Sequence, residues 1–321
     1  MKNIALVGTW HVHFEGYANT IAQDERCRIT ALWDPDETAG KAAAEKYGCD
    51  FEPDYDKLLA RQDVDAISVC TQTNLHPEII MKAAKAGKHI FTEKVLCFDT
   101  KTASELAEAI KNAGIEFCIS FVWRARGDFL WIKKVIDEGL LGELTYCRMR
   151  NAHNGAIAGW LPETFYDAES CGGGAMMDLG AHPMYLLNWF MGKPKAVSST
   201  FTNYMVNSVE DNAVSVIEYE NGAIGISETG FVAVHNPFSL EICGSKGSLF
   251  AGGPDDTVKY NVGDGWVTPE IPDGVKSPLC AWIDAINGGE SVPYTIDDAV
   301  ALTQTMEAAY VAHKENKKIT L

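Results

Sequence analysis

The stretch Asn3-Ile4-Ala5-Leu6-Val7-Gly8-Thr9-Trp10-His11-Val12-His13 decides the fold of this chain. Its apolar run at 3–7 ends in a glycine, and comparable short runs follow at 29–33, 66–70, 89–92 and 116–120. Amphipathic stretches at 37–47, 76–86 and 100–112 alternate with these runs. Strands and helices that alternate at this spacing are typical of a parallel sheet with crossover helices. We therefore predict an α/β domain over residues 1–122.

From about residue 140 the pattern changes to longer alternating runs, at 144–151, 196–206, 213–219, 223–231 and 239–243. Glu220-Asn221-Gly222 predicts a hairpin turn, because Asn-Gly readily takes positive φ. Helices are expected at 125–138, 174–190, 278–287 and 297–315, and loops with short strands at 251–277. These features predict an α+β domain over 123–321 with a large open, mainly antiparallel sheet. Such a sheet leaves a face to be covered, so we expect a homodimer or homotetramer.

The composition narrows the classes of partner. The 321 residues carry a formal charge of −17 and show no basic stripe, which argues against nucleic acid or an anionic membrane as partner. No apolar run has the length of a signal peptide or a membrane span. The nine cysteines form no CxxC pair, which suits reduced thiols and argues against structural zinc. The cytoplasm is the expected location.

The glycine at the end of the first strand points to a dinucleotide. In a Rossmann domain, glycines in this turn let the backbone approach the pyrophosphate at a helix N-terminus. Here only Gly8 matches, because Trp10 and His13 occupy the second and third glycine positions. Asp34 ends the next strand, where an acid binds the adenosine ribose and repels a 2′-phosphate. No arginine follows Asp34, so NAD is favoured over NADP. The alternative is that Asp34-Pro35-Asp36 only caps the next helix.

The remaining side chains of the turn leave more than one interpretation. His11 and His13 could bind phosphate or a metal, and Trp10 could stack on the nicotinamide or cover the pyrophosphate. All three could also fill the space of a repositioned loop. No Asp, Glu or Cys motif nearby completes a metal set, so we predict no metal. We place Gly8, Thr9 and these three residues in the cofactor site.

Two further segments carry candidate chemistry. Phe91-Thr92-Glu93-Lys94 ends a parallel strand, where ligands bind, and a desolvated Lys94 there can act as an acid or base. The alternative is an ordinary solvated lysine. Cys171 to His182 contains three glycines that allow close approach to a ligand or to the other domain. On a helix from 174, Asp178 and His182 are i, i+4 neighbours that can orient a substrate hydroxyl. The alternative is an acid near the helix start and a satisfied buried histidine.

Together these segments resemble the glucose–fructose oxidoreductase, inositol dehydrogenase and rhizopine-catabolism family, Gfo/Idh/MocA. The resemblance covers nearly the whole chain, and residues 172–192 are its most specific part. Its landmarks are Gly8, Asp34, Thr73-Asn74-Leu75-His76, Glu93-Lys94, Ser120 to Arg124 and the segment 139–144. It implies a Rossmann domain followed by an α+β domain, and NAD(P)-dependent oxidation or reduction of a secondary alcohol on a sugar, inositol or polyol.

The resemblance also implies roles for individual residues. Lys94 matches the catalytic lysine, Asp178 its supporting acid and His182 the family's histidine. A turn that contains Thr71, Asn74 and His76 falls close to the cofactor, as does Glu93, and Arg124 lies near the substrate. Three departures are visible: the glycine fingerprint is mostly replaced, Val95 follows Lys94 where proline is usual, and Gln72 replaces a proline.

The expected reaction is hydride transfer between the carbinol carbon and nicotinamide, with the hydroxyl proton passing to Lys94 or His182. Substrate contacts are expected from a loop-rich stretch that holds His153, Asn154, Trp160 and Tyr166, although plain loop packing explains each of them equally well. The connection His235-Asn236-Pro237 is a weaker candidate. Two alternatives stay open: an NAD-assisted enzyme that cleaves or eliminates a glycoside on the same scaffold, and a non-catalytic sugar-binding homologue with a degraded cofactor motif.

Overall fold

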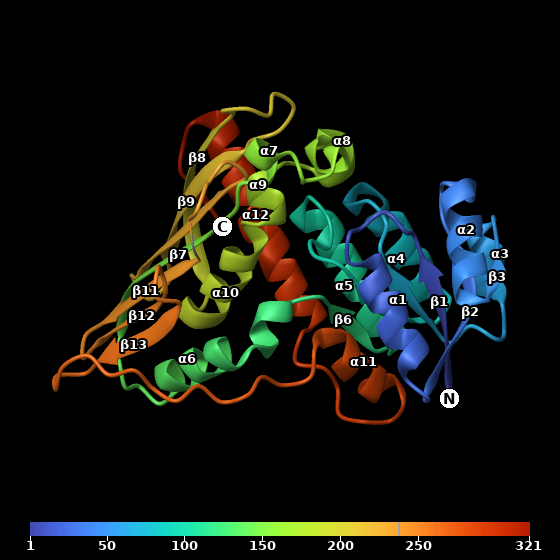
Figure 1. The fold of residues 1–321 in the computed structure, drawn as a ribbon, viewed down its shortest axis with the longest axis horizontal. Coiled ribbons are helices and arrows are strands. Elements are labelled where there is room, and N and C mark those ends of the chain that lie inside the picture. Colours follow the sequence, from blue (N-terminus) through green and yellow to red (C-terminus); the bar gives the residue numbers. More distant parts are fainter. Residues whose placement is uncertain (237) are drawn as a thin grey trace. The chain divides into compact units, whose positions relative to one another are not determined.

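The computed structural model describes residues 1–236 and 238–321, so Pro237 of the predicted His235-Asn236-Pro237 candidate lies outside the described residues. The chain forms two compact units (Figure 1). The first contains Met1–Phe121 and Lys276–Val300, and the second contains Val122–Val275 and Ala301–Leu321. The first division falls within one residue of the predicted boundary after residue 122, and residues 276–300 return to pack with the first unit. Helix α11 (Pro278–Ile286) explains this, since its buried Trp282 donates a hydrogen bond to the Glu116 carbonyl over 3.3 Å.

The first unit is a six-stranded parallel sheet. Its strand order is β3 (Asp50–Phe51), β2 (Cys27–Trp33), β1 (Lys2–Val7), β4 (Ala66–Val69), β5 (His89–Thr92) and β6 (Phe117–Ile119). This confirms the predicted parallel sheet. The strand order reverses between β1 and β4, and the carboxyl ends of all the strands lie at one edge. Ligands of open α/β sheets bind at such a switch point.

The helices of this unit follow local signals in the sequence. They are α1 (Phe14–Gln23), α2 (Glu37–Tyr47), α3 (Tyr55–Ala60), α4 (His76–Lys85) and α5 (Thr100–Ala113). Helix α2 begins after Asp36, whose carboxylate accepts from the Thr38 and Ala39 amides, and it ends at Gly48 in the left-handed conformation. Helices α1 and α3 were not predicted. Helix α1 has no side-chain N-cap bond and α3 has only six residues, so both carry weak local signals.

The second unit is an eight-stranded, mainly antiparallel sheet, as predicted. Its order is β13 (Thr257–Asn261), β12 (Ser248–Gly252), β11 (Ser239–Gly244), β7 (Leu144–Ala152), β10 (Ile224–Gly230), β9 (Asn212–Tyr219), β8 (Pro194–Thr202) and β14 (Ile319–Thr320). Strands β7 and β10 pair in parallel, so the sheet is mixed. The predicted hairpin turn joins β9 and β10, with Gly222 at φ 86°.

Helices of the second unit cover one face of this sheet. Helix α6 (Gly127–Asp137), helix α10 (Ala181–Met191) and the last part of α12 (Ile296–Glu315) lie on the same side of the strands (Figure 1). Strand β9 shows the resulting alternation, because Ser215 and Ile217 are fully buried whereas Val214 and Val216 are 38% and 36% exposed. The opposite face therefore presents apolar side chains to solvent. Among the described ranges, no helix combines the length and apolarity needed to cross a membrane.

Candidate active site

The turn after β1 packs tightly against the turn after β4. Gly8 has φ +82°, and a Cβ on it would lie 2.4 Å from Thr71 Cγ2 and 2.7 Å from the Thr71 amide nitrogen. Both constraints require glycine at this one fingerprint position. The buried oxygens Thr71 Oγ1 and Gln72 Oε1 accept or donate no hydrogen bond among residues 1–236 and 238–321. Buried polar atoms are normally paired, so these two atoms mark a place for a polar ligand.

Asp34 is buried at the end of β2 and anchors the glycine turn. Its Oδ2 accepts from the Thr9 amide and the Thr9 hydroxyl, each at 2.7 Å, while Oδ1 accepts from the Asp36 amide at 2.8 Å. Asp36, one position past Pro35, supplies the N-cap of α2. The segment Asp34-Pro35-Asp36 therefore does cap the helix, through Asp36 and not through Asp34, and the ribose role of Asp34 stays a prediction. Predicted site residues Thr9 and Asp34 lie in direct contact.

Buried Glu93 gathers four side chains at the carboxyl edge of the sheet. Glu93 Oε1 accepts from His13 Nδ1 at 2.8 Å and from the Tyr17 hydroxyl, which in turn pairs with Ser120 Oγ at 2.7 Å. His11 Nδ1 lies 3.8 Å from the same oxygen. Burial alone would raise the pKa of Glu93, but the charges and hydrogen bond of His11 and His13 hold it well below its usual range. The carboxylate is therefore ionised at neutral pH.

Sequence reasoning placed His11, His13 and Glu93 in the cofactor site but missed Tyr17, and used Ser120 only as a family landmark. Tyr17 lies on α1, one turn after His13, and burial followed by the charge of Glu93 raises its pKa. If helix α1 had been predicted, Tyr17 would have been expected close to His13, because the two residues are four positions apart. Tyr17 was missed because the helix itself was not predicted.

His11, His13 and Glu93 together offer three side chains that could ligate a metal ion. The sequence analysis had found no acid or cysteine near the two histidines in the chain, and the fold supplies Glu93. Their nitrogen and oxygen ligand atoms lie within 4.8 Å of one another. His11 Nδ1 already accepts from the His13 amide at 3.2 Å, and Glu93 Oε1 accepts from two donors. A metal at these atoms would have to displace those hydrogen bonds. The prediction that no metal binds here stays a prediction, and this hydrogen bonding supports it.

The turn after β4 begins the short helix η1 (Thr73–Leu75) and then α4. Asn74 is exposed, whereas His76 is buried and its Nδ1 lies 3.1 Å from the Val95 carbonyl oxygen. Burial lowers the pKa of His76 to about 4, so its imidazole is neutral at pH 7. The neighbouring Lys94 is only 6% exposed, its amide donates to Glu93 Oε2 at 3.2 Å, and the Lys94–Val95 peptide bond is cis.

In the second unit, Gly173 and Gly174 accommodate protein atoms of the same unit, while Gly172 ends the short helix α8 (Ala168–Cys171) at φ 76°. A Cβ on Gly173 would lie 2.0 Å from Tyr310 Oη, and one on Gly174 would lie 2.1 Å from the Glu210 carbonyl oxygen. Buried Glu210 Oε1 accepts from the Gly174 amide at 2.9 Å, the Met176 amide at 3.0 Å and Tyr310 Oη at 2.6 Å. Gly173 and Gly174 are thus required by packing within this unit, whereas the sequence had indicated close approach to a ligand or to the other domain.

The expected single helix over 174–190 is wrong. Helix α9 (Ala175–Asp178) ends and α10 begins at Ala181, with Gly180 between them. A Cβ on Gly180 would lie 2.5 Å from the Met176 carbonyl oxygen, so the chain turns too closely for a continuous helix. The helix-face argument for Asp178 and His182 therefore does not hold. The charge of half-buried Asp178 instead acts on His153, whose pKa is lowered by burial and partly restored by this carboxylate.

His182 is held by an aromatic cluster. Its Nδ1 lies 2.9 Å from the hydroxyl oxygen of Tyr185, one turn along α10. The Trp123 ring, from the short helix η2 (Val122–Ala125), stacks on the imidazole at 4.7 Å with 21° between the planes. Tyr185 and Trp123 were not predicted, since neither has a motif. The predicted Arg124 lies beside them, with its guanidinium 4.9 Å from the Trp189 ring centre.

Most of the predicted substrate residues lie together around His153. Its ring stacks on Phe231 at 5.2 Å and contacts Trp160 at 4.5 Å, and its Nδ1 accepts from the Gly155 amide at 3.0 Å. Asn154 accepts a hydrogen bond from the exposed Trp160 indole over 3.3 Å. The predicted Tyr166 packs on the same apolar cluster, which contains Phe231. The structure therefore gathers His153, Asn154, Trp160 and Tyr166 in one region.

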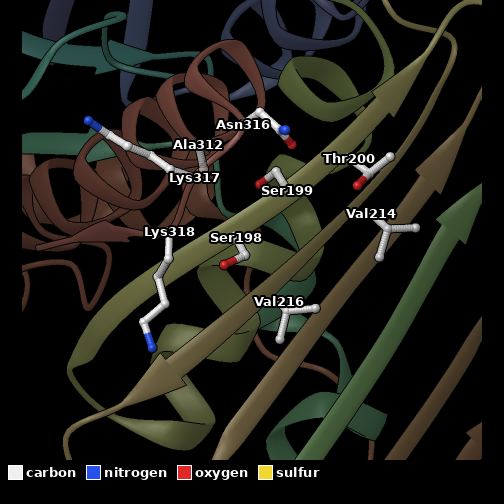
Figure 2. Close-up of a pocket in the computed structure, with 9 residues that line it drawn as sticks. All are labelled: Ser198, Ser199, Thr200, Val214, Val216, Ala312, Asn316, Lys317 and Lys318. Atoms are coloured by element: carbon white, nitrogen blue, oxygen red, sulfur yellow. The ribbon is translucent and has the colours of Figure 1, made fainter.

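A cavity of about 330 Å³ lies elsewhere in the second unit, on β8, β9 and the end of α12. Figure 2 shows Thr200, Val214 and Val216 projecting from the two strands there. None of its lining residues is a predicted site residue. Its lysines are engaged in surface ion pairs, Lys318 with Glu218 and Lys317 with Glu315. The cavity belongs to the exposed sheet face and not to the candidate site.

Two family models match the chain. One, described as the oxidoreductase family with an NAD-binding Rossmann fold, matches residues 2–121, and the GFO/IDH/MocA C-terminal domain matches residues 129–250. An inositol 2-dehydrogenase of Rhizobium meliloti (strain 1021) is 25% identical over 321 residues, covering 95% of this chain and 95% of that protein.

A second relative has another activity. A 2,7-anhydro-N-acetylneuraminate hydratase of Mediterraneibacter gnavus is 33% identical over 157 residues, covering 48% of this chain and 41% of that protein. Among solved structures, GenD2 from gentamicin A biosynthesis in complex with NAD superposes with a TM-score of 0.84 at 25% identity, covering 100% of this chain and 96% of that one. The likeness to that structure extends over both units.

Proposed function

Because the chain belongs to the Gfo/Idh/MocA family of NAD-binding oxidoreductases, we propose that it oxidises, or in reverse reduces, a secondary alcohol of a sugar, an inositol or a related polyol. The chain is an enzyme of the class that acts on CH–OH groups, and its relatives include a named inositol 2-dehydrogenase. The observation that carries the proposal is buried Lys94 at the carboxyl end of β5, beside the ionised Glu93 cluster.

The residues at this edge fit an NAD molecule. Gly8 leaves a cradle that a Cβ would fill, and Thr71 Oγ1 and Gln72 Oε1 are buried atoms without a protein partner among the described residues. Asp34 would accept the adenosine ribose hydroxyls, and its negative charge disfavours a 2′-phosphate. The His11 and His13 imidazoles would take over the anion contacts that glycine amides make in the usual fingerprint. When bound, NAD exchanges a hydride with the carbinol carbon of the substrate.

The chain's own groups then handle the proton. In the oxidation direction the substrate hydroxyl loses its proton to the neutral Lys94 amine, and the reverse reaction returns it. Asp178 and His182 orient the substrate hydroxyls by accepting and donating hydrogen bonds.

A lysine replacement tests the assignment. Lys94→Ala should lower turnover by about 10³-fold, within the range for losing an acid/base group, while NAD affinity measured by calorimetry stays within a few-fold. Lys101→Ala, at an exposed position of α5, is the matched control and should leave turnover unchanged. Near-normal turnover of Lys94→Ala would sink the assignment.

Substrate recognition is proposed for the region around His153. Aromatic Trp160 and Phe231 would contact the C–H face of a hydroxylated ring, while His153 and Asn154 would bind its hydroxyls. Asn154→Ala should raise KM more than it lowers kcat, since the residue would act mainly on binding. An unchanged KM for every polyol that the enzyme oxidises would remove Asn154 from the substrate site.

The similarity to a named hydratase supports a second candidate function, an NAD-assisted cleavage or elimination in which the cofactor is regenerated within each cycle. Absorbance of the reduced cofactor separates the two. A dehydrogenase accumulates NADH in a screen of polyols and aldoses with NAD, whereas the alternative consumes substrate with no net NADH. Absence of any NAD or NADP binding by calorimetry would instead favour a non-catalytic sugar-binding role.

We also propose that the chain self-associates through the open face of its eight-stranded sheet, as a dimer or tetramer. Val214, Val216, Ile224 and Phe250 are each between 36% and 42% exposed on this face. Sedimentation of Val216→Glu should show a smaller species than that of the unmodified protein. A monomeric unmodified protein at micromolar concentration would contradict the proposal.

The nine cysteines support a cytoplasmic location, which also remains a proposal. All of them carry free thiols, as expected for a protein that works in a reducing compartment. Titration with a thiol reagent in denaturant should count nine reactive groups without prior reduction, and a lower count would speak against this location.

A further inference from the structure

We propose that Gln72 binds the ribose next to the nicotinamide ring of NAD, through a hydrogen bond between its side-chain amide and a ribose hydroxyl. The inference rests on the proposed function, because it names a contact to the same cofactor. All the residues that carry it belong to the first unit. The proline that the family usually has at this position could not make the contact.

The backbone at Gln72 does not require a glutamine. The residue lies between β4 and the short helix η1, with φ −57° and ψ 145°. This φ is within the range that proline adopts. Within residues 1–236 and 238–321, the Gln72 amide nitrogen donates no hydrogen bond that a proline would lose. Any advantage of glutamine over proline therefore lies in its side chain.

The side-chain oxygen of Gln72 lacks a donor. Gln72 Oε1 is shielded from solvent and accepts no hydrogen bond from the described part of the chain, and the side chain does not cap η1. A shielded carbonyl oxygen without a donor costs free energy, so such atoms are normally paired. A hydroxyl group suits either orientation of the amide, because it can donate to the oxygen or accept from the nitrogen. A hydroxylated ligand is therefore the partner that this side chain fits.

The strand order indicates which hydroxyls of NAD lie at this turn. Strands β2, β1, β4 and β5 are successive neighbours in the sheet. Asp34 ends β2, where an acid binds the adenosine ribose, and the glycine turn after β1 approaches the pyrophosphate. The other half of NAD then extends past β4 toward Lys94, which follows β5. The group next to the pyrophosphate in that half is the nicotinamide ribose, so it falls at the turn after β4.

The turns after β1 and β4 are in direct contact. A Cβ on Gly8 would lie 2.4 Å from Thr71 Cγ2, and the His11 amide donates to the Cys70 carbonyl over 3.0 Å. A ligand that lies on the first turn therefore continues onto the second. Thr71 Oγ1, beside Gln72 in the chain, is another shielded oxygen without a partner among the described residues. Two adjacent residues thus offer polar atoms to the two neighbouring hydroxyls of one ribose.

The first test compares ligands by calorimetry on the unmodified protein. The ligands are NAD, two NAD analogues that lack the 2′- or the 3′-hydroxyl of the nicotinamide ribose, and ADP, which lacks this ribose altogether. We expect at least one analogue to bind about tenfold more weakly than NAD, as for the loss of one neutral hydrogen bond. Equal affinities for NAD and both analogues overturn the proposal without any variant.

The second test uses two replacements of Gln72. Gln72→Leu removes the amide at similar size, and Gln72→Pro introduces a residue that the backbone conformation accommodates. Both variants should bind NAD about tenfold more weakly and bind the weaker analogue as tightly as NAD, while the ADP affinity stays within about twofold. Gln62→Leu is the matched control, because Gln62 is exposed and precedes β4, and it should leave every affinity unchanged.

Two outcomes with the variants refute the role of Gln72. If both variants still distinguish the analogue from NAD, another group binds the hydroxyl. If they lose affinity for ADP as strongly as for NAD, Gln72 shapes the turn without contacting the ribose. Failure of the proposed function is a separate result. An unmodified protein that binds neither NAD nor ADP would overturn the NAD role and this inference together, whereas NAD binding without discrimination overturns only the inference.

Discussion

Tyr310→Phe removes one hydrogen bond from the carboxylate that organises the glycine segment before Asp178. Tyr310 Oη donates to Glu210 Oε1 over 2.6 Å, and burial together with the Glu210 charge raises the pKa of this phenol. The phenyl ring stays, so the change opens no large cavity. A hydrogen bond to a buried charged acceptor contributes about 1.5–3 kcal/mol. We expect the free energy of unfolding to fall by about 2 kcal/mol.

A double-mutant cycle with Glu210→Gln isolates the bond. The glutamine oxygen can still accept from the Gly174 and Met176 amides, but it accepts more weakly without the charge. We expect the double variant to lose less than the sum of the two single losses, by about 1 kcal/mol or more, because the two groups are in contact. Urea unfolding at pH 7, followed by circular dichroism and tryptophan fluorescence, gives all four free energies.

Tyr204→Phe is the matched control, since Tyr204 is 78% exposed in the same unit. Its stability should lie within about 0.5 kcal/mol of the unmodified protein. The reasoning is refuted if Tyr310→Phe is equally silent, or if the two single losses simply add. Either result would mean that the Gly174 and Met176 amides, and not Tyr310, keep Glu210 in place.

Three further predictions follow from other contacts. Gly174→Ala should lower the free energy of unfolding by about 3 kcal/mol or more, because the new Cβ would lie 2.1 Å from a backbone oxygen. Gly16→Ala, on α1 with open space around it, should instead raise it by about 0.5–1 kcal/mol. Losses of equal size in urea unfolding would contradict this prediction. Asp34→Asn should weaken NAD binding by about tenfold in calorimetry and reduce the ratio of the NAD affinity to the NADP affinity. Asp36→Asn should leave the NAD affinity and this ratio unchanged. Equal effects of the two variants would contradict the ribose role of Asp34. Burial lowers the pKa of His76 to about 4, so the free energy of unfolding includes the full contribution of the neutral imidazole above pH 6.5. Up to about 3 kcal/mol of this free energy is lost as the pH falls from 6.5 to 4. His76→Gln should make the free energy of unfolding depend less on pH in this range, and an unchanged dependence would show that other groups cause it.

Local sequence signals determined much of the first unit. The short apolar runs and amphipathic stretches predicted the parallel sheet and three of its helices, because their periodicity and caps depend on residues only a few positions apart. The end of β5 brought Glu93 and Lys94 to the ligand-binding edge for the same reason. The mixed sheet of the second unit was predicted in outline, while its parallel β7–β10 pair was not, since pairing direction is not a local property.

Tertiary structure alone decided what the glycines and the charged residues contact. A glycine run indicates that other atoms approach the backbone closely but not which atoms. At Gly173 and Gly174 these atoms belong to Tyr310 and Glu210, both distant in sequence. The break between α9 and α10 arises from the same kind of contact, at Gly180.

The residues that opened the sequence show the same division. The sequence by itself predicted Gly8, the strand before it and a cofactor turn in which His11 and His13 replace glycines. Only the fold showed that these imidazoles share Glu93 with Tyr17, from a helix without a strong local signal. The physical reason is range: backbone preferences act between near neighbours along the chain, whereas a buried carboxylate is stabilised by whichever donors packing brings within hydrogen-bonding distance.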